Sequence, residues 1–193
     1  MKSQVVFIRL LLLLVLAVPQ TLAADDDENN QWKVNWNHGT TVESPNGKFK
    51  LKLTNRIQFR FTQEDPEMGG SMGSFRIRRF KFKLAGTALE NVKFQFQANF
   101  AGDPELEDAW LQYTKNHWIQ PRVGQMKVAF GRQNLTSSGK QQFVDRTLVV
   151  GEFEARRDQG ITVIGHNKNK TFEYNVGIYN GNGVNNKIGR AHV

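Results

Sequence analysis

The sequence predicts an all-β protein built as an antiparallel meander of about seven strands, and three observations support this prediction. From residue 47 onward, apolar and polar side chains alternate with a period of two, as they do in strands with two different faces. Clusters of Gly, Pro, Asn and Asp separate the alternating segments. No segment after residue 23 that is longer than a turn has helical periodicity.

Residues 1–23 have the form of a secretory signal peptide. Lys2 and Arg9 precede an apolar run at residues 10–18, and small residues end the segment before Ala24. The apolar run is too short to cross a bilayer as a helix. The chain has no Cys and therefore no disulfide framework. We expect export to the envelope of a bacterium, with a secreted soluble protein as the alternative.

Residues 24–46 are expected to be an acidic linker and a lead-in to the sheet. The segment 24–30, ADDDENN, has no apolar side chain beyond its first Ala and is typical of a solvated linker. Trp32, Val34 and Trp36 then occupy alternate positions. This pattern leaves two possibilities open, an additional strand or an aromatic lead-in.

The charge of the chain favours an anionic partner. The sequence has 26 basic and 18 acidic residues, a net charge of +8, and without Lys2 and Arg9 the excess is 24 over 18, or +6. The basic residues stand at alternate positions within strands and not in a tail or a recognition helix. Nucleic acid is therefore not the expected partner.

The first two strands carry the clearest pattern. Phe49, Leu51, Leu53, Ile57, Phe59 and Phe61 predict one apolar face, with Lys and Arg between them. A loop at residues 64–74 precedes the second strand, where the apolar phase shifts after Ile77 and resumes at Phe80. A shift of one residue predicts a β-bulge near Arg78 and Arg79.

Five further strands are expected, separated by the remaining breaker clusters. The third, which carries Val92, Phe94, Phe96 and Ala98, follows a turn at residues 86–91. Residues 107–115, 122–130, 160–166 and 171–180 complete the set. The connection at residues 131–157 is the longest, and long connections without secondary structure are usually functional or disordered.

Alternation of this kind fits a soluble β-sandwich or a membrane β-barrel. In a sandwich the apolar faces of two sheets pack together, whereas in a barrel they face lipid and the polar faces line a lumen. Basic residues crowd the polar faces of the first two strands, although a solvated surface usually mixes both signs. Short and long connections also alternate, as they do at the two ends of a barrel. These features favour the barrel.

Several motifs resemble the phosphate-selective porin O and P family, in the order in which that family has them. The resemblance covers roughly residues 47–181. The motifs are FRIRRFKFKLAGTALENVKFQFQANFAG (75–102), LEDAWLQY (106–113), RVGQMKVAFG (122–131), LTSSGKQQFVDRTL (135–148) and RRDQGITVIG (156–165). The chain departs from the family pattern at Ala129, where Pro is usual, and at Gln133, where Glu is usual.

The resemblance implies the first part of a transmembrane β-barrel of the sixteen-strand porin class, a homotrimer when full length, in the outer membrane and in contact with its lipid. The barrel would be incomplete in this chain, because about seven strands cannot close a barrel of this class and open strand edges are costly in lipid. Residues 47–187 would form the partial barrel, and residues 131–157 its inward-folded third loop. Residues 188–193, IGRAHV, look like a translated sequencing adapter, so we expect the chain to be the amino-terminal part of a longer gene product.

The resemblance also implies passive passage of small anions, phosphate or polyphosphate among them, and Lys and Arg suit that role because they bind oxyanions. We expect Lys127, Arg132, Lys140 and Arg146 near the constriction. The expected wall of the lumen consists of Lys48, Lys50, Lys52, Arg56, Arg60, Arg78 and Lys81. The alternative function, for the sandwich, is a secreted module that binds acidic polysaccharide.

Catalysis, cofactors and metals are not expected. Ser137 and Ser138 lack the context of a nucleophile elbow, and the four His residues lack metal-ligand spacing. Four carboxylates lie in or beside the long connection, and we expect them to pair with Arg146, Arg156 and Arg157 and so hold the loop; they are Asp145, Glu152, Glu154 and Asp158.

Overall fold

The computed structural model describes residues 31–64, 72–137, 139–142, 147 and 156–186. The expected signal peptide, the acidic segment 24–30, the segment 188–193 and Arg146 lie outside these residues. The chain divides into two compact units, Met1–Gln31 and Trp32–Val193. Everything that follows concerns the second unit.

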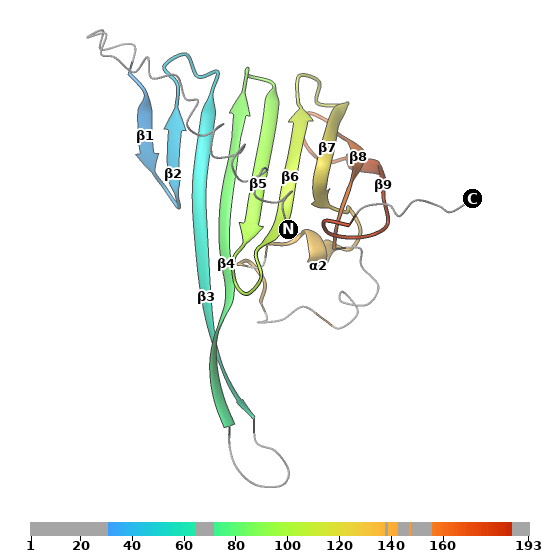
Figure 1. Ribbon diagram of the computed structural model, residues 1–193. Coiled ribbons are helices and arrows are strands. Elements are labelled where there is room, and N and C mark those ends of the chain that lie inside the picture. The colour runs from blue at the N-terminus through green and yellow to red at the C-terminus, as the bar shows by residue number, and fades with distance from the viewer. Residues whose placement is uncertain (1–30, 65–71, 138, 143–146, 148–155, 187–193) are drawn as a thin grey trace, which may run out of the picture. The chain divides into compact units, whose positions relative to one another are not determined.

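Nine antiparallel strands form one sheet in chain order, so that each strand pairs with the next (Figure 1). One short helix, α2, spans Arg132–Leu135. Among the described residues, no helix has the length and apolarity needed to cross a membrane. The strands are β1 (Lys33–Trp36), β2 (Thr40–Glu43), β3 (Lys50–Glu64), β4 (Met72–Ala88), β5 (Val92–Asn99), β6 (Glu105–Tyr113), β7 (Gln120–Lys127), β8 (Arg157–His166) and β9 (Glu173–Tyr179).

The all-β meander is confirmed, and the seven expected strands correspond to β3 through β9. The two additional strands come from the segment that the alternation of Trp32, Val34 and Trp36 left open. β1 pairs with β2, and β2 pairs with the first four residues of β3, Lys50 to Leu53. The lead-in is therefore a short hairpin added to the edge of the sheet.

The register separates the two faces of the sheet. Leu53 pairs with Leu84 and Ile57 with Phe80 on one side, whereas Arg56 pairs with Lys81 on the other. We call these the apolar face and the polar face. The alternation of the sequence thus continues from strand to strand, because partners in register point to the same side.

The burial of the two faces is the reverse of that in a soluble sandwich. Among the described residues, the buried hydrophobic side chains are Ala98 and Met126, whereas the buried set includes nine polar or charged residues. Phe59 is 77% exposed and Phe75 is 84% exposed on the apolar face. The described residues form a single sheet with no second sheet against this face, so the sandwich alternative has no support.

Two bulges occur on the polar face. The register of β3 and β4 shifts between Gln58 and Phe59, so that Arg78 is the extra residue, and the bulge predicted from the phase change is confirmed. A second shift in the pairing of β5 with β6 makes Glu107 the extra residue of β6. Each bulge places two consecutive charged residues of one strand close to the polar face.

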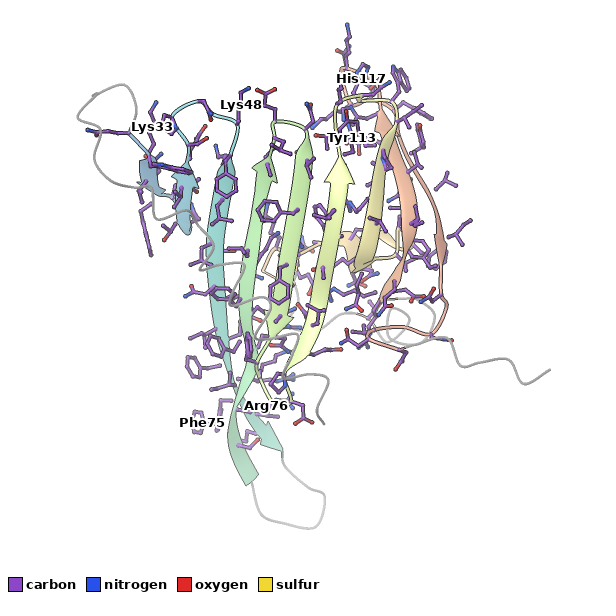
Figure 2. All side chains as sticks on the ribbon, turned by 45° about the horizontal axis from the view of Figure 1, so that its top comes forward. Lys33, Lys48, Phe75, Arg76, Tyr113 and His117 are labelled. Carbon is purple, nitrogen blue, oxygen red and sulfur yellow. The ribbon has the colours of Figure 1, made fainter. Side chains whose placement is uncertain are left out.

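The connections separate into two ends. Residues 89–91, 114–119 and 167–172 make short turns at one end, where Lys48, Tyr113 and His117 lie (Figure 2). Residues 65–71 and 128–156 are the longer connections at the other end. There the β3–β4 hairpin extends beyond its neighbours, because β4 pairs with β5 only from Lys81 onward. Phe75 and Arg76 lie on this projecting part (Figure 2).

Candidate functional site: a basic cavity on the polar face

A cavity of about 1250 Å³ lies over the polar face. Its lining comes from strands that are distant in the sequence and from the connection after β7. Lys52 and Arg56 of β3 contribute to it, as do Lys140 and Arg156 of the long connection. The described part of that connection therefore shares one space with the basic side chains of the first strands. Five of the residues expected in the constriction or the lumen wall line it: Lys52, Arg56, Lys81, Lys127 and Lys140.

The basic wall is made by cross-strand neighbours. Arg56 lies opposite Lys81, and Arg60 lies opposite Arg76. Like charges in such positions destabilise a sheet unless counter-charges or ligands are present. Lys81 has such a counter-charge in Glu107 of β6, at 2.5 Å.

Two of the expected wall residues are engaged in ion pairs near the short turns. Lys48 precedes β3 and lies 3.1 Å from Glu90, with both side chains more than half exposed. Lys50 lies 3.3 Å from Glu43 of β2. Both ammonium groups have a carboxylate partner, so neither adds a full positive charge to the wall.

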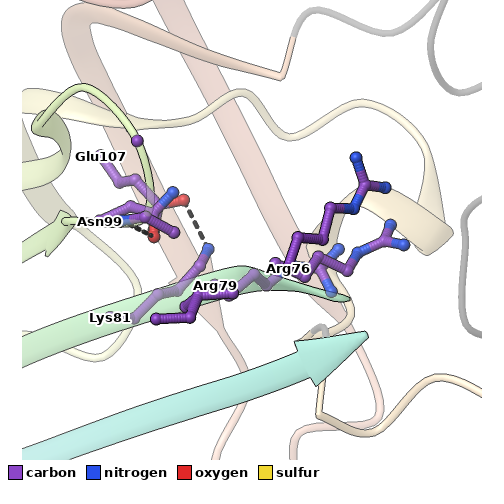
Figure 3. A pocket seen from close by; sticks show the side chains of 9 residues that line it. Arg76, Arg79, Lys81, Asn99 and Glu107 are labelled. Carbon is purple, nitrogen blue, oxygen red and sulfur yellow. Dashed lines mark hydrogen bonds and ion pairs between the residues drawn. The ribbon is translucent and has the colours of Figure 1, made fainter. Parts of the chain in front are cut away.

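The bulge of β4 creates a second, smaller cavity of about 470 Å³ (Figure 3). Arg76, Arg78, Arg79 and Lys81 line it together with Glu107. In a regular strand, Arg78 and Arg79 would point to opposite faces, whereas the extra residue lets both contribute to the same cavity. Arg79 also donates a hydrogen bond to Gln58 across the strand pair, at 2.9 Å.

A carboxylate pair on β6 neutralises the centre of this basic surface. Glu107 accepts from Lys81 of β4 at 2.5 Å and from the side chain of Gln97 on β5. Asp108 accepts from Arg157 of β8, with Nε–Oδ1 at 2.9 Å and Nη2–Oδ2 at 3.3 Å. Glu107 and Asp108 are 7% and 4% exposed. We call Lys81, Glu107, Asp108 and Arg157 the buried charge network.

The described partners of Arg157 lie on β6. Its guanidinium binds Asp108 and, at 3.5 Å, Glu107. Asp158 accepts from the backbone N–H of Gly181 at 2.5 Å, whereas Asp145, Glu152 and Glu154 lie outside the described residues. In the sequence, Asp108 is in phase with Gln112 in the alternation of its strand, opposite to Ala109 and Leu111.

Lys127 holds the start of the long connection. Its Nζ donates to the backbone carbonyl of Asn134 at 2.6 Å and lies 3.5 Å from the carbonyls of Leu135 and Thr136. A cation at the carboxyl end of a helix satisfies carbonyls that have no partner within the helix. Asn134, which is buried, donates in turn to the carbonyl of Arg156 at 3.1 Å. The two ends of the connection are thereby joined.

The structure describes the other three residues expected at the constriction to different extents. Lys140 is exposed, and its N–H donates to the carbonyl of Ser137 in a turn. Arg132 is the first residue of α2. Arg146 lies outside the described residues.

A cation that the sequence analysis did not single out lies deeper in the large cavity. The guanidinium carbon of Arg122 is 4.1 Å from the ring centroid of Trp110, a cation–π contact. Arg122 also donates to Gln112, which donates to Gln120 at 2.8 Å. Among the described residues, no group of three or more His, Cys, Asp or Glu could hold a metal ion.

The sequence profile of one family, phosphate-selective porin O and P, matches residues 49–192, which is most of the chain. The chain belongs to this porin family. The porin family is a family of channels and not a class of enzymes, and it implies the bacterial outer membrane and the passage of phosphate-like anions. The comparison of this porin chain with curated proteins gave no match.

Proposed function

We propose that this porin chain contributes the basic side of an outer-membrane pore through which small anions, including phosphate and polyphosphate, diffuse passively. The polar face would line the lumen, and the connection at residues 131–157 would narrow it. The observation that carries the proposal is the large cavity, since Lys52 and Arg56 of the wall and Lys140 of the connection line the same space. Rings of such cations select anions in pores.

The apolar face supports the membrane part of the proposal. Ile57, Phe59 and Phe61 are at least half exposed along β3, which would be costly in water and is favourable against acyl chains. Tyr113, Trp118 and other exposed aromatic residues lie near the short turns. Aromatic side chains in such positions typically mark the boundary between lipid and water.

The proposal includes export and assembly. Residues 1–23 would direct the chain across the inner membrane and be removed before Ala24. The mature protein would assemble as a homotrimer in contact with outer-membrane lipid, as the family resemblance implies. Catalysis has no part in this function.

Charge reversal at Lys140 tests the proposal. The protein is reconstituted into planar bilayers, and the reversal potential is measured across a KCl gradient. Lys140→Glu should reduce the anion-to-cation permeability ratio about threefold or more at 0.1 M salt, because it changes the local charge by two units. The matched control is Lys168→Glu, which should leave the ratio unchanged, since Lys168 is exposed in the turn at residues 167–172 and lines neither cavity. A protein that forms no channel, or a cation-selective channel, would exclude the proposed function.

A further inference from the structure

Gly139 is the point where the long connection meets the opposite wall. It follows the residues after α2 and lies inside the turn in which Lys140 N–H donates to the Ser137 carbonyl at 2.8 Å. A β-carbon added at Gly139 would lie 2.7 Å from Cζ and Nη2 of Arg56 and 2.8 Å from its Nη1. The backbone of the connection therefore rests directly on the guanidinium of a β3 residue.

This contact joins parts of the chain that are otherwise far apart. Arg56 belongs to β3, and the connection leaves the sheet from β7, four strands along the sheet. Both Arg56 and Lys140 line the large cavity. The position of the guanidinium in this cavity therefore depends on how closely the backbone at residue 139 approaches it.

A side chain at residue 139 would act on the guanidinium and not on the fold. Real β-carbons are almost never found within 3.0 Å of another heavy atom, so Arg56 or the connection would have to move. The atoms in the way belong to the end of a long, flexible side chain. Such a side chain can adopt another rotamer, so the charge would be displaced while the sheet is preserved.

We propose that Gly139 is a specificity-determining position. Because Gly139 has no side chain, the Arg56 guanidinium can lie against the connection, and its place there sets where a small oxyanion binds during passage. The inference rests on the proposed function, because it requires anions to pass through the large cavity. It concerns the geometry of the passage and not the total charge. Changing residue 139 should therefore alter oxyanion recognition without altering the charge of the protein.

The test is block of chloride current by inorganic phosphate in single channels of the protein. Coulomb attraction falls inversely with distance, so a shift of the guanidinium from about 4 Å to about 6 Å from a bound anion predicts roughly five- to tenfold weaker block in Gly139→Ala. Gly73→Ala is the control, because a β-carbon there would approach the Phe61 ring on the apolar face, at 3.0 Å, and Gly73 lines neither cavity. It should leave phosphate block unchanged.

A second background separates the contact with Arg56 from a general effect on the loop. In Arg56→Ala the obstructing group is absent, so adding Gly139→Ala should change phosphate block less than twofold, as expected when one residue acts through the other. Open channels of Gly139→Ala with unaltered phosphate block would overturn the inference alone. An equal weakening of phosphate block by Gly139→Ala in the unmodified protein and in Arg56→Ala would also overturn the inference alone. An unmodified protein without anion current would overturn the proposed function, and this inference with it.

Discussion

Replacing Arg157 with Met should destabilise the porin more than any change to its exposed ion pairs. Arg157 is the first residue of β8, and its side chain is 13% exposed. Its guanidinium meets Asp108 through two contacts, at 2.9 Å and 3.3 Å. Met preserves most of the apolar length of the side chain and removes the charge, so the variant isolates the ionic contribution.

The expected loss of stability depends on the partners that Glu107 and Asp108 keep when Arg157 is replaced. Glu107 keeps Lys81 at 2.5 Å, whereas Asp108 keeps a hydrogen bond from the side-chain amide of Gln95, at 3.2 Å, and the more distant charges of Lys83 and Arg122. Removing one member of a buried ion pair costs about 3 to 5 kcal/mol because a charge is left without compensation. Since Lys81 lies close to the affected carboxylates, we expect the lower value, about 3 kcal/mol.

The assay is denaturant-induced unfolding of the folded protein in detergent micelles, followed by tryptophan fluorescence. Lys48→Met is the matched control, because its partner Glu90 lies at a similar distance of 3.1 Å but both side chains are 59% and 56% exposed. Exposed pairs of this kind contribute about 0 to 1 kcal/mol. An Arg157→Met variant within about 1 kcal/mol of this control would refute the argument from burial.

A double variant tests whether the cost comes from the unpaired carboxylate. Asp108→Asn removes the negative charge that Arg157→Met would leave buried without its ion-pair partner. The two changes together should therefore cost about 2 kcal/mol less than the sum of the single changes. Strict additivity would mean that Arg157 stabilises the fold through packing and not through Asp108.

Three further predictions concern the bulge, a turn and the long connection. Deleting Arg78 should leave a folded channel of lower anion selectivity, because Ile77 followed directly by Arg79 restores regular alternation. Heat-modifiable gel mobility tests the folding and bilayer recordings test the selectivity. Loss of folding would contradict the prediction. Leu89→Gly should raise the free energy of unfolding by about 1 kcal/mol, measured by denaturation, because Leu89 has a positive φ of 51° and its side chain is exposed. Lys127→Met should make the connection after β7 more susceptible to limited proteolysis, because the carbonyls at the carboxyl end of α2 lose their donor. An unchanged cleavage rate would show that the hydrogen bond from Asn134 to the Arg156 carbonyl is sufficient to hold the connection.

Local alternation explains how much of the fold could be predicted. In β3, alternate residues such as Ile57 and Phe59 point to one face because successive side chains of a strand point in opposite directions. A shift in that alternation marked the bulge at Arg78 for the same reason. The short hairpin of β1 and β2 could not be predicted with the same force, because four residues do not distinguish a strand from an aromatic lead-in.

The contacts of the candidate site depended on tertiary structure. Three contacts show this: Arg157 meets Asp108, Lys127 binds the carbonyl of Asn134, and Gly139 lies against Arg56. In each of them, groups that are distant in the sequence are brought together by the pairing of strands or by the path of a connection. Alternation assigns a residue to a face, but its partner on that face depends on register, and each bulge shifts the register by one residue. The amino-acid pattern therefore determined the two faces and the basic character of one of them, whereas the pairing of charges on that face followed only from the assembled sheet.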